Sequence, residues 1–167
     1  MDAVAREKSS AGSTLMVSTP SDREILMTRV FNAPRRLVFQ AWTTPELFSR
    51  WFGPRGFTVP VCEMDLRPGG AWRCIMRSPD GVEMGMKGVY QEIVPYERLV
   101  STEIYDDYEE YGASLNTLTL EEKDGVTTLT TRVLYPSMET RDAVIASGME
   151  GGASQTLDRL EELLATM

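Results

Sequence analysis

The sequence has no histidine, and this absence limits the chemistry that the protein could perform. Ser-His-Asp and Cys-His catalytic sets need an imidazole, and so do most catalytic zinc sites. There is also no recognisable nucleophile–base pair and no Gly-rich phosphate loop, which argues against an enzyme. Any catalysis would have to depend on carboxylates, tyrosines, lysines or a cysteine.

A basic patch and a long apolar run are also missing. The net charge is −8, the pI is about 4.7 and no run of lysines and arginines is present, so we expect no binding of nucleic acid. No apolar run approaches the roughly 18 residues of a membrane span, so we expect no membrane insertion. With only two cysteines and no apolar signal-peptide core in residues 1–20, we expect a cytoplasmic protein.

The residues that are present fit one α+β domain. The chain of 167 residues is long enough for one core, and its 42% of hydrophobic residues is ordinary for a globular protein. Small and polar residues dominate residues 1–22, which we interpret as a flexible tail with a short strand near Thr14–Ser18. Residues 23–167 then form the folded domain.

The folded domain is predicted to contain an antiparallel sheet, with two short helices after its first strand. Alternating residues predict a strand over Glu24–Phe31. Asn32 is expected to cap a short helix with Pro34 in its first turn, and a second short helix is expected over Pro45–Phe52. Residues 57–134 contain five or six strand-like runs separated by turn signals, which is typical of an antiparallel meander.

The last segment, from Met138 to Met167, is predicted to be a long helix. Apolar residues recur at steps of three and four from Met149 to Leu164, which gives one apolar stripe on a helix of about 20 residues or more. Gly148, Gly151 and Gly152 interrupt the helical pattern, so we expect a kink or a separate first turn there.

The hairpins can be aligned by separating apolar from charged side chains. Centring the first turn on Pro68 pairs Met64 with Trp72, Cys62 with Cys74 and Pro60 with Met76 on the inner face. The outer face then pairs Glu63 with Arg73 and Val59 with Arg77. A Pro79-Asp80-Gly81 loop, with Gly81 in the left-handed region, continues the inner face by pairing Met76 with Met84, Cys74 with Met86 and Trp72 with Gly88.

Several motifs resemble those of one known family. They are Val30-Phe31-Asn32-Ala33-Pro34, Trp51-Phe52-Gly53-Pro54, Asp65-Leu66-Arg67-Pro68-Gly69-Gly70, Gly88-Val89-Tyr90-Gln91-Glu92-Ile93, and Gly148-Met149 through Leu157-Asp158-Arg159-Leu160. Residues 23–165 are thereby similar to a bacterial member of the family of the activator of the heat-shock-protein-90 ATPase, within the START-like helix-grip superfamily.

The resemblance implies a fold and a pocket. The fold is a curved antiparallel sheet wrapped around a long C-terminal helix, with a pocket between the sheet and the helix. Many relatives carry Trp where this chain has Ala153, which implies more room in the pocket here. The co-chaperones that give the family its name carry an additional domain, so chaperone activation is not implied.

The inner face of the sheet and the C-terminal helix supply most of the candidate ligand-binding residues. The candidates are Trp51, Met64, Trp72, Met76, Met84, Met86, Tyr90, Met149 and Ala153. Unbranched methionines can repack around varied apolar guests, and ordinary core filling is the equal alternative for them. We expect no catalytic residue, no metal and no cofactor.

Three further groups have alternative interpretations. Cys62 and Cys74 are expected to be buried, reduced thiols, with a redox pair as the alternative and zinc ligation less favoured. The acidic and aromatic run Glu103–Tyr111 is expected to be a solvated loop with tyrosines at the pocket rim, with a lid or a cation site as the alternative. Glu103 and Arg132 are expected to form an outward surface pair, with a buried pair as the alternative.

Three functional hypotheses follow. The first is a binding module, a carrier or sensor of a hydrophobic, ring-containing or acyl small molecule, with a stress or signalling role by analogy. The second is a cyclase, aromatase or hydrolase that uses the same pocket. The third is a module that docks on a basic protein partner through its acidic surface. Formation of a homodimer is a further alternative that the sequence leaves undecided.

Overall fold

An eight-stranded antiparallel sheet is the frame of the structure, a computed structural model that describes residues 14–167. Its strands lie in the order β1-β2-β8-β7-β6-β5-β4-β3. The elements follow along the chain as β1 (Met16–Ser18), β2 (Glu24–Phe31), α2 (Arg35–Thr43), α3 (Pro45–Trp51), β3 (Thr58–Met64), β4 (Ala71–Arg77), β5 (Glu83–Val94), β6 (Arg98–Tyr105), the 3-10 helix η2 (Asp106–Tyr111), β7 (Ser114–Lys123), β8 (Val126–Leu134), α4 (Met138–Ala146) and α5 (Met149–Leu164). This is the α+β order expected from the sequence.

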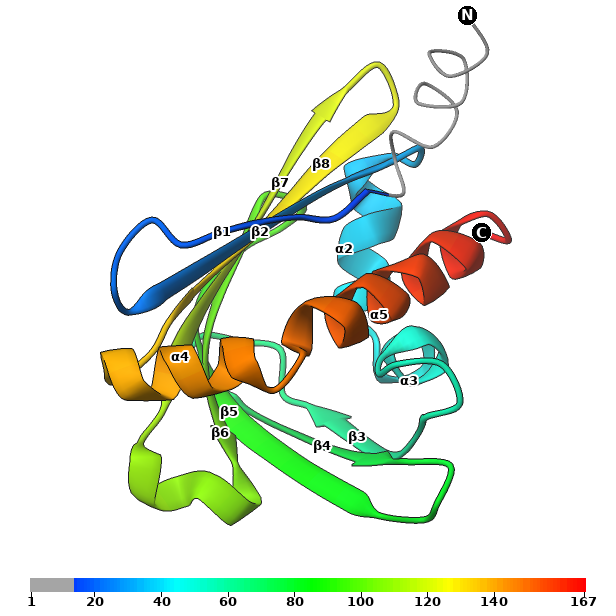
Figure 1. Cartoon of the computed structure of the whole chain (residues 1–167). Helices are drawn as coiled ribbons and strands as arrows, with labels where there is room; N and C mark the ends of the chain where they lie inside the picture. Colours follow the sequence, from blue (N-terminus) through cyan, green and yellow to red (C-terminus); the bar gives the residue numbers. More distant parts are fainter. Residues whose placement is uncertain (1–13) are drawn as a thin grey trace, which may run out of the picture.

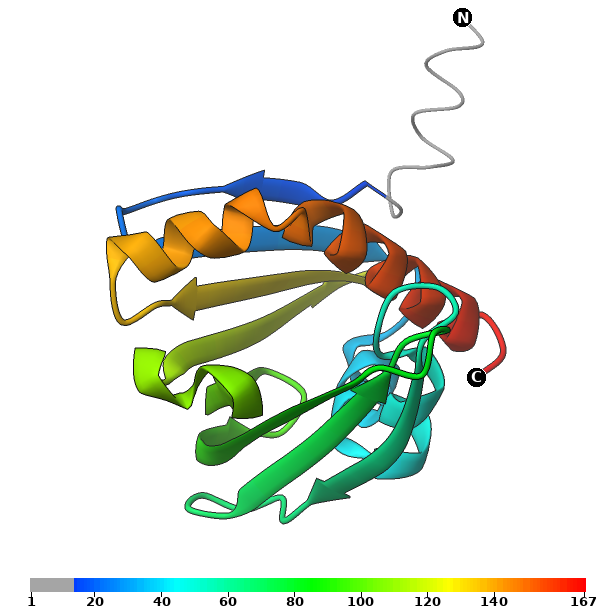
Figure 2. The same cartoon turned by 60° about the horizontal axis from the view of Figure 1, so that its bottom comes forward.

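The sheet curves around the C-terminal helices. Figure 1 shows α4 and α5 crossing the concave side of the sheet, with α2 and α3 next to α5. Figure 2, turned by 60°, shows the strands bending beneath the same two helices. The α2–α3 segment joins β2 to β3, which lie near opposite ends of the strand order. This is the helix-grip arrangement that the resemblance implied.

The N-terminal segment contributes one short strand. The strand expected near Thr14–Ser18 is found as β1, which pairs with β2 so that Met16 lies opposite Thr28. The rest of the predicted flexible tail, residues 1–13, lies outside the described residues.

The hairpin register was predicted correctly over most of β3, β4 and β5. The pairs Met64 with Trp72, Cys62 with Cys74, Glu63 with Arg73, Met76 with Met84, Cys74 with Met86 and Trp72 with Gly88 all occur. The pairs Val59 with Arg77 and Pro60 with Met76 were wrong, because Thr58 faces Arg77 and the register shifts between Thr58 and Val61. Pro60 has no N–H to donate to a ladder, so a β-bulge is favoured at this position.

Gly88 lets a tryptophan cross the sheet surface. The indole Nε1 of Trp72, on β4, donates a hydrogen bond of 3.2 Å to the carbonyl oxygen of Thr102 on β6. Gly88 lies between them on β5, and a Cβ atom there would overlap both the Thr102 oxygen and the indole nitrogen. The predicted pairing of Trp72 with Gly88 therefore has a direct steric cause.

The two short helices begin at prolines. The first begins at Arg35 with Pro34 as its N-cap, so the prediction that Asn32 caps this helix was wrong. A residue that precedes proline avoids the helical region, and Pro34 itself is extended at φ −68° and ψ 148°. The second helix, α3, has Pro45 in its first turn and ends at Trp51, one residue before the predicted end.

The C-terminal helix is divided in two at Gly148. This residue has a φ of 81°, in the left-handed region that favours glycine, and it separates α4 from α5. The break confirms the expected separate first segment. It also makes the prediction of one helix of 20 or more residues wrong, because α5 has 16.

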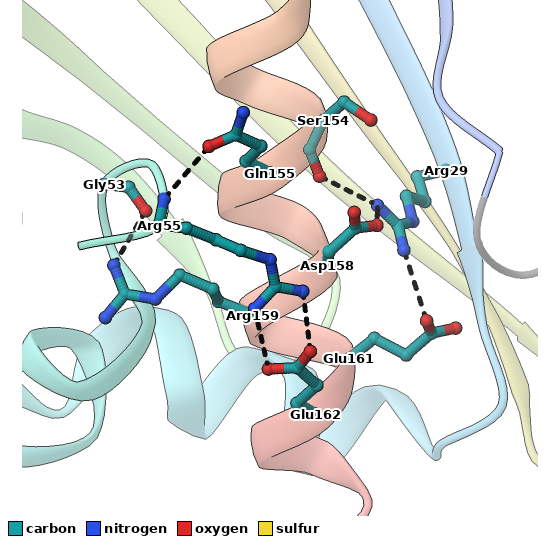
Figure 3. Close-up of polar contacts among 9 residues, drawn as sticks. All are labelled: Arg29, Gly53, Arg55, Ser154, Gln155, Asp158, Arg159, Glu161 and Glu162. Atoms are coloured by element: carbon teal, nitrogen blue, oxygen red, sulfur yellow. Dashed lines mark hydrogen bonds and ion pairs between the residues drawn. The ribbon is translucent and has the colours of Figure 1, made fainter. Parts of the chain in front are cut away.

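Ion pairs hold α5 on both of its sides (Figure 3). On one side, the fully buried side chain of Arg29 on β2 contacts Asp158 at 2.7 Å and Glu161 at 3.3 Å. On the other side, Arg55, in the loop after α3, pairs with Glu162 at 2.6 Å. These ion pairs therefore tie the helix to both the sheet and the α3–β3 connection.

Candidate ligand-binding site

A cavity lies between the concave face of the sheet and helices α4 and α5. Its volume is about 360 Å³. Strands β2 to β8 and helices α2 to α5 all contribute side chains to it, most of them aromatic, leucine or methionine. Small-molecule pockets in proteins have this size and this apolar character.

The structure brings together eight of the nine candidate residues. The candidates that line the cavity are Trp51, Met64, Trp72, Met76, Met86, Tyr90, Met149 and Ala153. Met84 does not line it and is 38% exposed. Met84 lies opposite Met76 as predicted, but it is the second residue of β5, next to the hairpin loop and beyond the end of the cavity.

An aromatic cluster from α2 and α3 closes one end of the cavity. The ring centroids of Trp42 and Trp51 are 4.9 Å apart, and those of Phe48 and Trp51 are 5.2 Å apart. Trp51 is fully buried, and its Nε1 donates to the carbonyl oxygen of Ala41 at 3.0 Å. This hydrogen bond and these ring contacts make Trp51 a fixed part of the wall. Among the described residues, the Nε1 of Trp42 has no hydrogen-bond partner.

Two thiols lie at the sheet side of the cavity. The Sγ atoms of Cys62 and Cys74 are 3.4 Å apart and both residues are free. Cys74 is buried and lines the cavity, whereas Cys62 is only half-buried, so the prediction of burial holds fully for Cys74 alone. The thiol of Cys74 donates to Cys62, which lowers the pKa of Cys62, and the same bond together with burial raises the pKa of Cys74.

The other end of the cavity is polar. Alternate residues of a strand point to the same side, and β6 thereby places Ser101, Glu103 and Tyr105 on the concave face. Burial raises the pKa of Glu103 to about 7, and a hydrogen bond from the Asn116 side chain on β7 opposes this rise. The charge of Glu103 and then burial raise the pKa of Tyr105, while burial and then Glu103 raise that of Tyr135.

The inward position of Glu103 overturns the expected surface pair with Arg132. Arg132 instead contacts Glu24 at 2.8 Å, with half of its side chain exposed. The parity of β6 was ambiguous because the β5–β6 register shifts between Tyr90 and Glu92, a bulge that no turn residue announces. Leu99, Ser101, Glu103 and Tyr105 alternate along β6 and all line the cavity, but Leu99 and Val100 are both apolar and both buried, so the sequence pattern did not fix the parity.

The acidic run after Glu103 forms the end of β6 and then η2. Asp106 makes two contacts of 2.6 Å with the guanidinium of Arg73, which lower the pKa of Asp106. Tyr108 and Tyr111 are more than half exposed and do not line the cavity, whereas Tyr105 does. The run is therefore mainly a solvated segment that is joined to β4 by the ion pair between Asp106 and Arg73. Of these three tyrosines, only Tyr105 borders the cavity.

A family model relates this fold and cavity to known proteins. The model for the activator of Hsp90 ATPase homolog 1-like proteins matches residues 32–165. The chain belongs to this family. The match runs from the start of the α2 segment to the end of α5, so it includes most of the residues that surround the cavity.

Solved structures of this helix-grip type agree with the assignment. A protein from Rhodobacter sphaeroides is 30% identical, with a TM-score of 0.84 over 92% of this chain and 99% of that one. Protein NE0264 from Nitrosomonas europaea is 26% identical, with a TM-score of 0.80 over 89% of this chain and 97% of that one. CalU16 from Micromonospora echinospora is 25% identical, with a TM-score of 0.61 over 90% of this chain and 83% of that one. Among curated proteins, none matches the chain.

The described residues also bear on metal binding and on membrane insertion. Within residues 14–167, no three Cys, Asp or Glu side chains are grouped as metal ligands would be. No helix in the same part of the chain is long and apolar enough to cross a membrane.

Proposed function

We propose that the protein binds a hydrophobic small molecule in the cavity beneath α4 and α5, as a carrier or a sensor. The main support for this proposal is the cavity itself, which has a volume of about 360 Å³ inside a domain whose core is otherwise filled by side chains. Close packing is the rule in protein interiors, and a space of this size is rare unless a ligand uses it.

The side chains that line the cavity can adapt to apolar ligands of different shapes. Met64, Met76, Met86 and Met149 line it, and the flexible thioether side chain can follow the outline of different apolar groups. Ala153 lines the helix side of the cavity, where the family resemblance implies a larger indole in many relatives and therefore more room here. The two free thiols suit a reducing compartment, and we place the protein in the cytoplasm.

The test is to fill the cavity from the helix side. Ala153→Trp should weaken binding of the neutral dye N-phenyl-1-naphthylamine by roughly tenfold or more, because the indole occupies the space of the dye. The buried indole should leave the thermal stability equal or higher, since it adds apolar contact. Ala143→Trp, at an exposed position of α4, is the matched control and should leave dye binding unchanged.

The contrary result is also well defined. If the parent protein binds no apolar dye and Ala153→Trp destabilises it, the space is closed in solution and the methionines are ordinary core. Docking on a protein partner would then become the first hypothesis.

One observation favours a second candidate, an enzyme that uses the same cavity. Glu103 lines the cavity with a pKa of about 7, where a carboxyl group can both accept and donate a proton. An enzyme of this kind would convert a bound compound and would lose turnover, but not binding, on Glu103→Gln. Recovery of every bound compound unchanged after prolonged incubation would exclude it.

A further inference from the structure

The polar end of the cavity contains one acid and no base. Of the described residues that line the cavity, Glu103 is the only carboxylic acid, and none is a lysine or an arginine. Asn116 donates a hydrogen bond to the carboxylate, and Ser114 occupies the Asn116 side-chain oxygen at 3.3 Å. The carboxyl group therefore faces the cavity with polar support but without an opposite charge in the lining.

Within residues 14–167, no positively charged side chain contributes to the electrostatic environment that shifts the pKa of Glu103. Cys74 on β4, Tyr105 on β6 and Tyr135 after β8 are the titratable groups that interact with its charge, and each is neutral when protonated. From the helices, Val144 and Met149 reach the cavity, and both are apolar.

Two arginines on other strands of the sheet, Arg73 on β4 and Arg132 on β8, are already paired. Arg73 is held by Asp106 at 2.6 Å, and Arg132 is held by Glu24 at 2.8 Å. The protein thus leaves the charge of Glu103 to be balanced by a proton or by a ligand.

A ligand that enters this end must meet that charge. A carboxylate would place a second negative charge beside Glu103 in a poorly solvated space, which is unfavourable. An ammonium group would supply the missing opposite charge, and the rings of Tyr105 and Tyr135 could add cation–π attraction. A neutral alcohol would gain only a hydrogen bond.

We infer that the cavity selects hydrophobic amines: compounds with an ammonium group beside Glu103 and an apolar, ring-containing body that extends toward Trp42, Phe48 and Trp51. This inference rests on the proposed function, and it replaces the acyl ligands of the sequence-based hypothesis with a different head group. Glu103 is the specificity-determining residue, and the aromatic end of the cavity holds the apolar body.

The test uses three probes with one ring system and different head groups. They are 2-(2-naphthyl)ethylamine, 2-(2-naphthyl)ethanol and 2-naphthylacetic acid, titrated at pH 8 and pH 5.5 by calorimetry. At pH 8 the amine should bind roughly tenfold or more tightly than the alcohol, and the acid should bind most weakly.

The pH dependence tests the same inference without any mutation. With a pKa of about 7, Glu103 is ionised to about 90% at pH 8 and to about 3% at pH 5.5. The alkylamine carries its proton at both pH values, so its affinity should rise roughly 10- to 30-fold between pH 5.5 and pH 8. The affinity of the alcohol should change much less.

Glu103→Gln and a matched control complete the design. Glu103→Gln keeps the shape of the side chain but removes its charge, so it should abolish the preference for the amine over the alcohol. Glu92→Gln, which removes a half-exposed carboxylate paired with Arg98, should keep the preference. Equal binding of all three probes, or tightest binding of the acid, would overturn the amine inference and leave the proposed function intact. If no probe binds the parent protein, both fall.

Discussion

The guanidinium of Arg29 lies 2.7 Å from the carboxylate of Asp158, and this contact joins β2 to α5. Arg29 is fully buried, and it also contacts Glu161 at 3.3 Å and the carbonyl oxygen of Ser154 at 3.3 Å (Figure 3). A buried guanidinium is costly unless it is neutralised, so these contacts are a condition for burying it. The same contacts set the position of α5 above the cavity.

The first prediction concerns this clamp. Asp158→Asn should lower the free energy of unfolding by about 1–3 kcal/mol, because a buried positive charge loses part of its compensation while Glu161 remains. Glu162→Gln on the same helix breaks only the exposed pair with Arg55, so it should lower the free energy of unfolding much less than Asp158→Asn does. Urea unfolding at pH 7 measures both. An equal or larger cost for Glu162→Gln would show that the clamp does not hold the helix.

The second prediction concerns Glu103 and pH. Its pKa of about 7 in the folded protein is higher than the ordinary glutamate value of 4.5. A raised pKa contributes stability that is fully present below pH 4.5 and is lost as the pH rises to 7, because the folded state retains a proton that the unfolded state releases. The loss amounts to about 1–3 kcal/mol.

Glu103→Gln removes this dependence. Relative to the parent, the variant should therefore gain about 1–3 kcal/mol of unfolding free energy between pH 5 and pH 8 in urea titrations. Glu92→Gln, at a half-exposed pair, serves as the control and should show no comparable gain. A relative stability of Glu103→Gln that is the same at both pH values would place Glu103 in contact with bulk water.

The third prediction concerns the order in which the thiols react. Cys62 is half-buried and the hydrogen bond from Cys74 lowers its pKa, whereas Cys74 is buried and its pKa is raised. Since the thiolate is the nucleophile, iodoacetamide should alkylate Cys62 before Cys74 in the native protein. Peptide mass spectrometry after timed labelling gives the order, and unfolded protein, in which both thiols react, is the control. Labelling of Cys74 first would contradict the arrangement in which Cys74 is buried and donates a hydrogen bond to the more accessible Cys62.

The hairpin register shows what could be predicted from the sequence alone. Only one alignment of β3, β4 and β5 puts Trp72, Cys74 and Met76 on one face and the charged residues on the other, and the small size of Gly88 agrees with it. Local alternation and turn chemistry are sufficient for such a result, because both act over a few residues.

The remaining features depend on contacts between distant segments. The bulge at Val59–Pro60 changes the register at a proline that the predicted alignment did not allow for, and the bulge between Tyr90 and Glu92 has no distinctive residue and concealed the inward position of Glu103. Met84 was assigned to the correct pair but lies beyond the end of the cavity. The position of this end of the cavity depends on where α4 and α5 cross the sheet. The alternation of residues within a strand predicts which face a side chain is on, but not where the helices cross.

The binding of an apolar molecule in the cavity is tested most directly by its effect on the methionine methyl groups. Protein labelled with [13C-methyl]methionine would be titrated with N-phenyl-1-naphthylamine and followed by 1H–13C NMR. If the dye occupies the cavity, the methyl signals of the methionines that line it should shift, namely those of Met27, Met64, Met76, Met86 and Met149. The exposed Met84 and Met138 should not shift. Shifts confined to Met84 and Met138, or no shifts at saturating dye, would contradict the binding of an apolar molecule in the cavity.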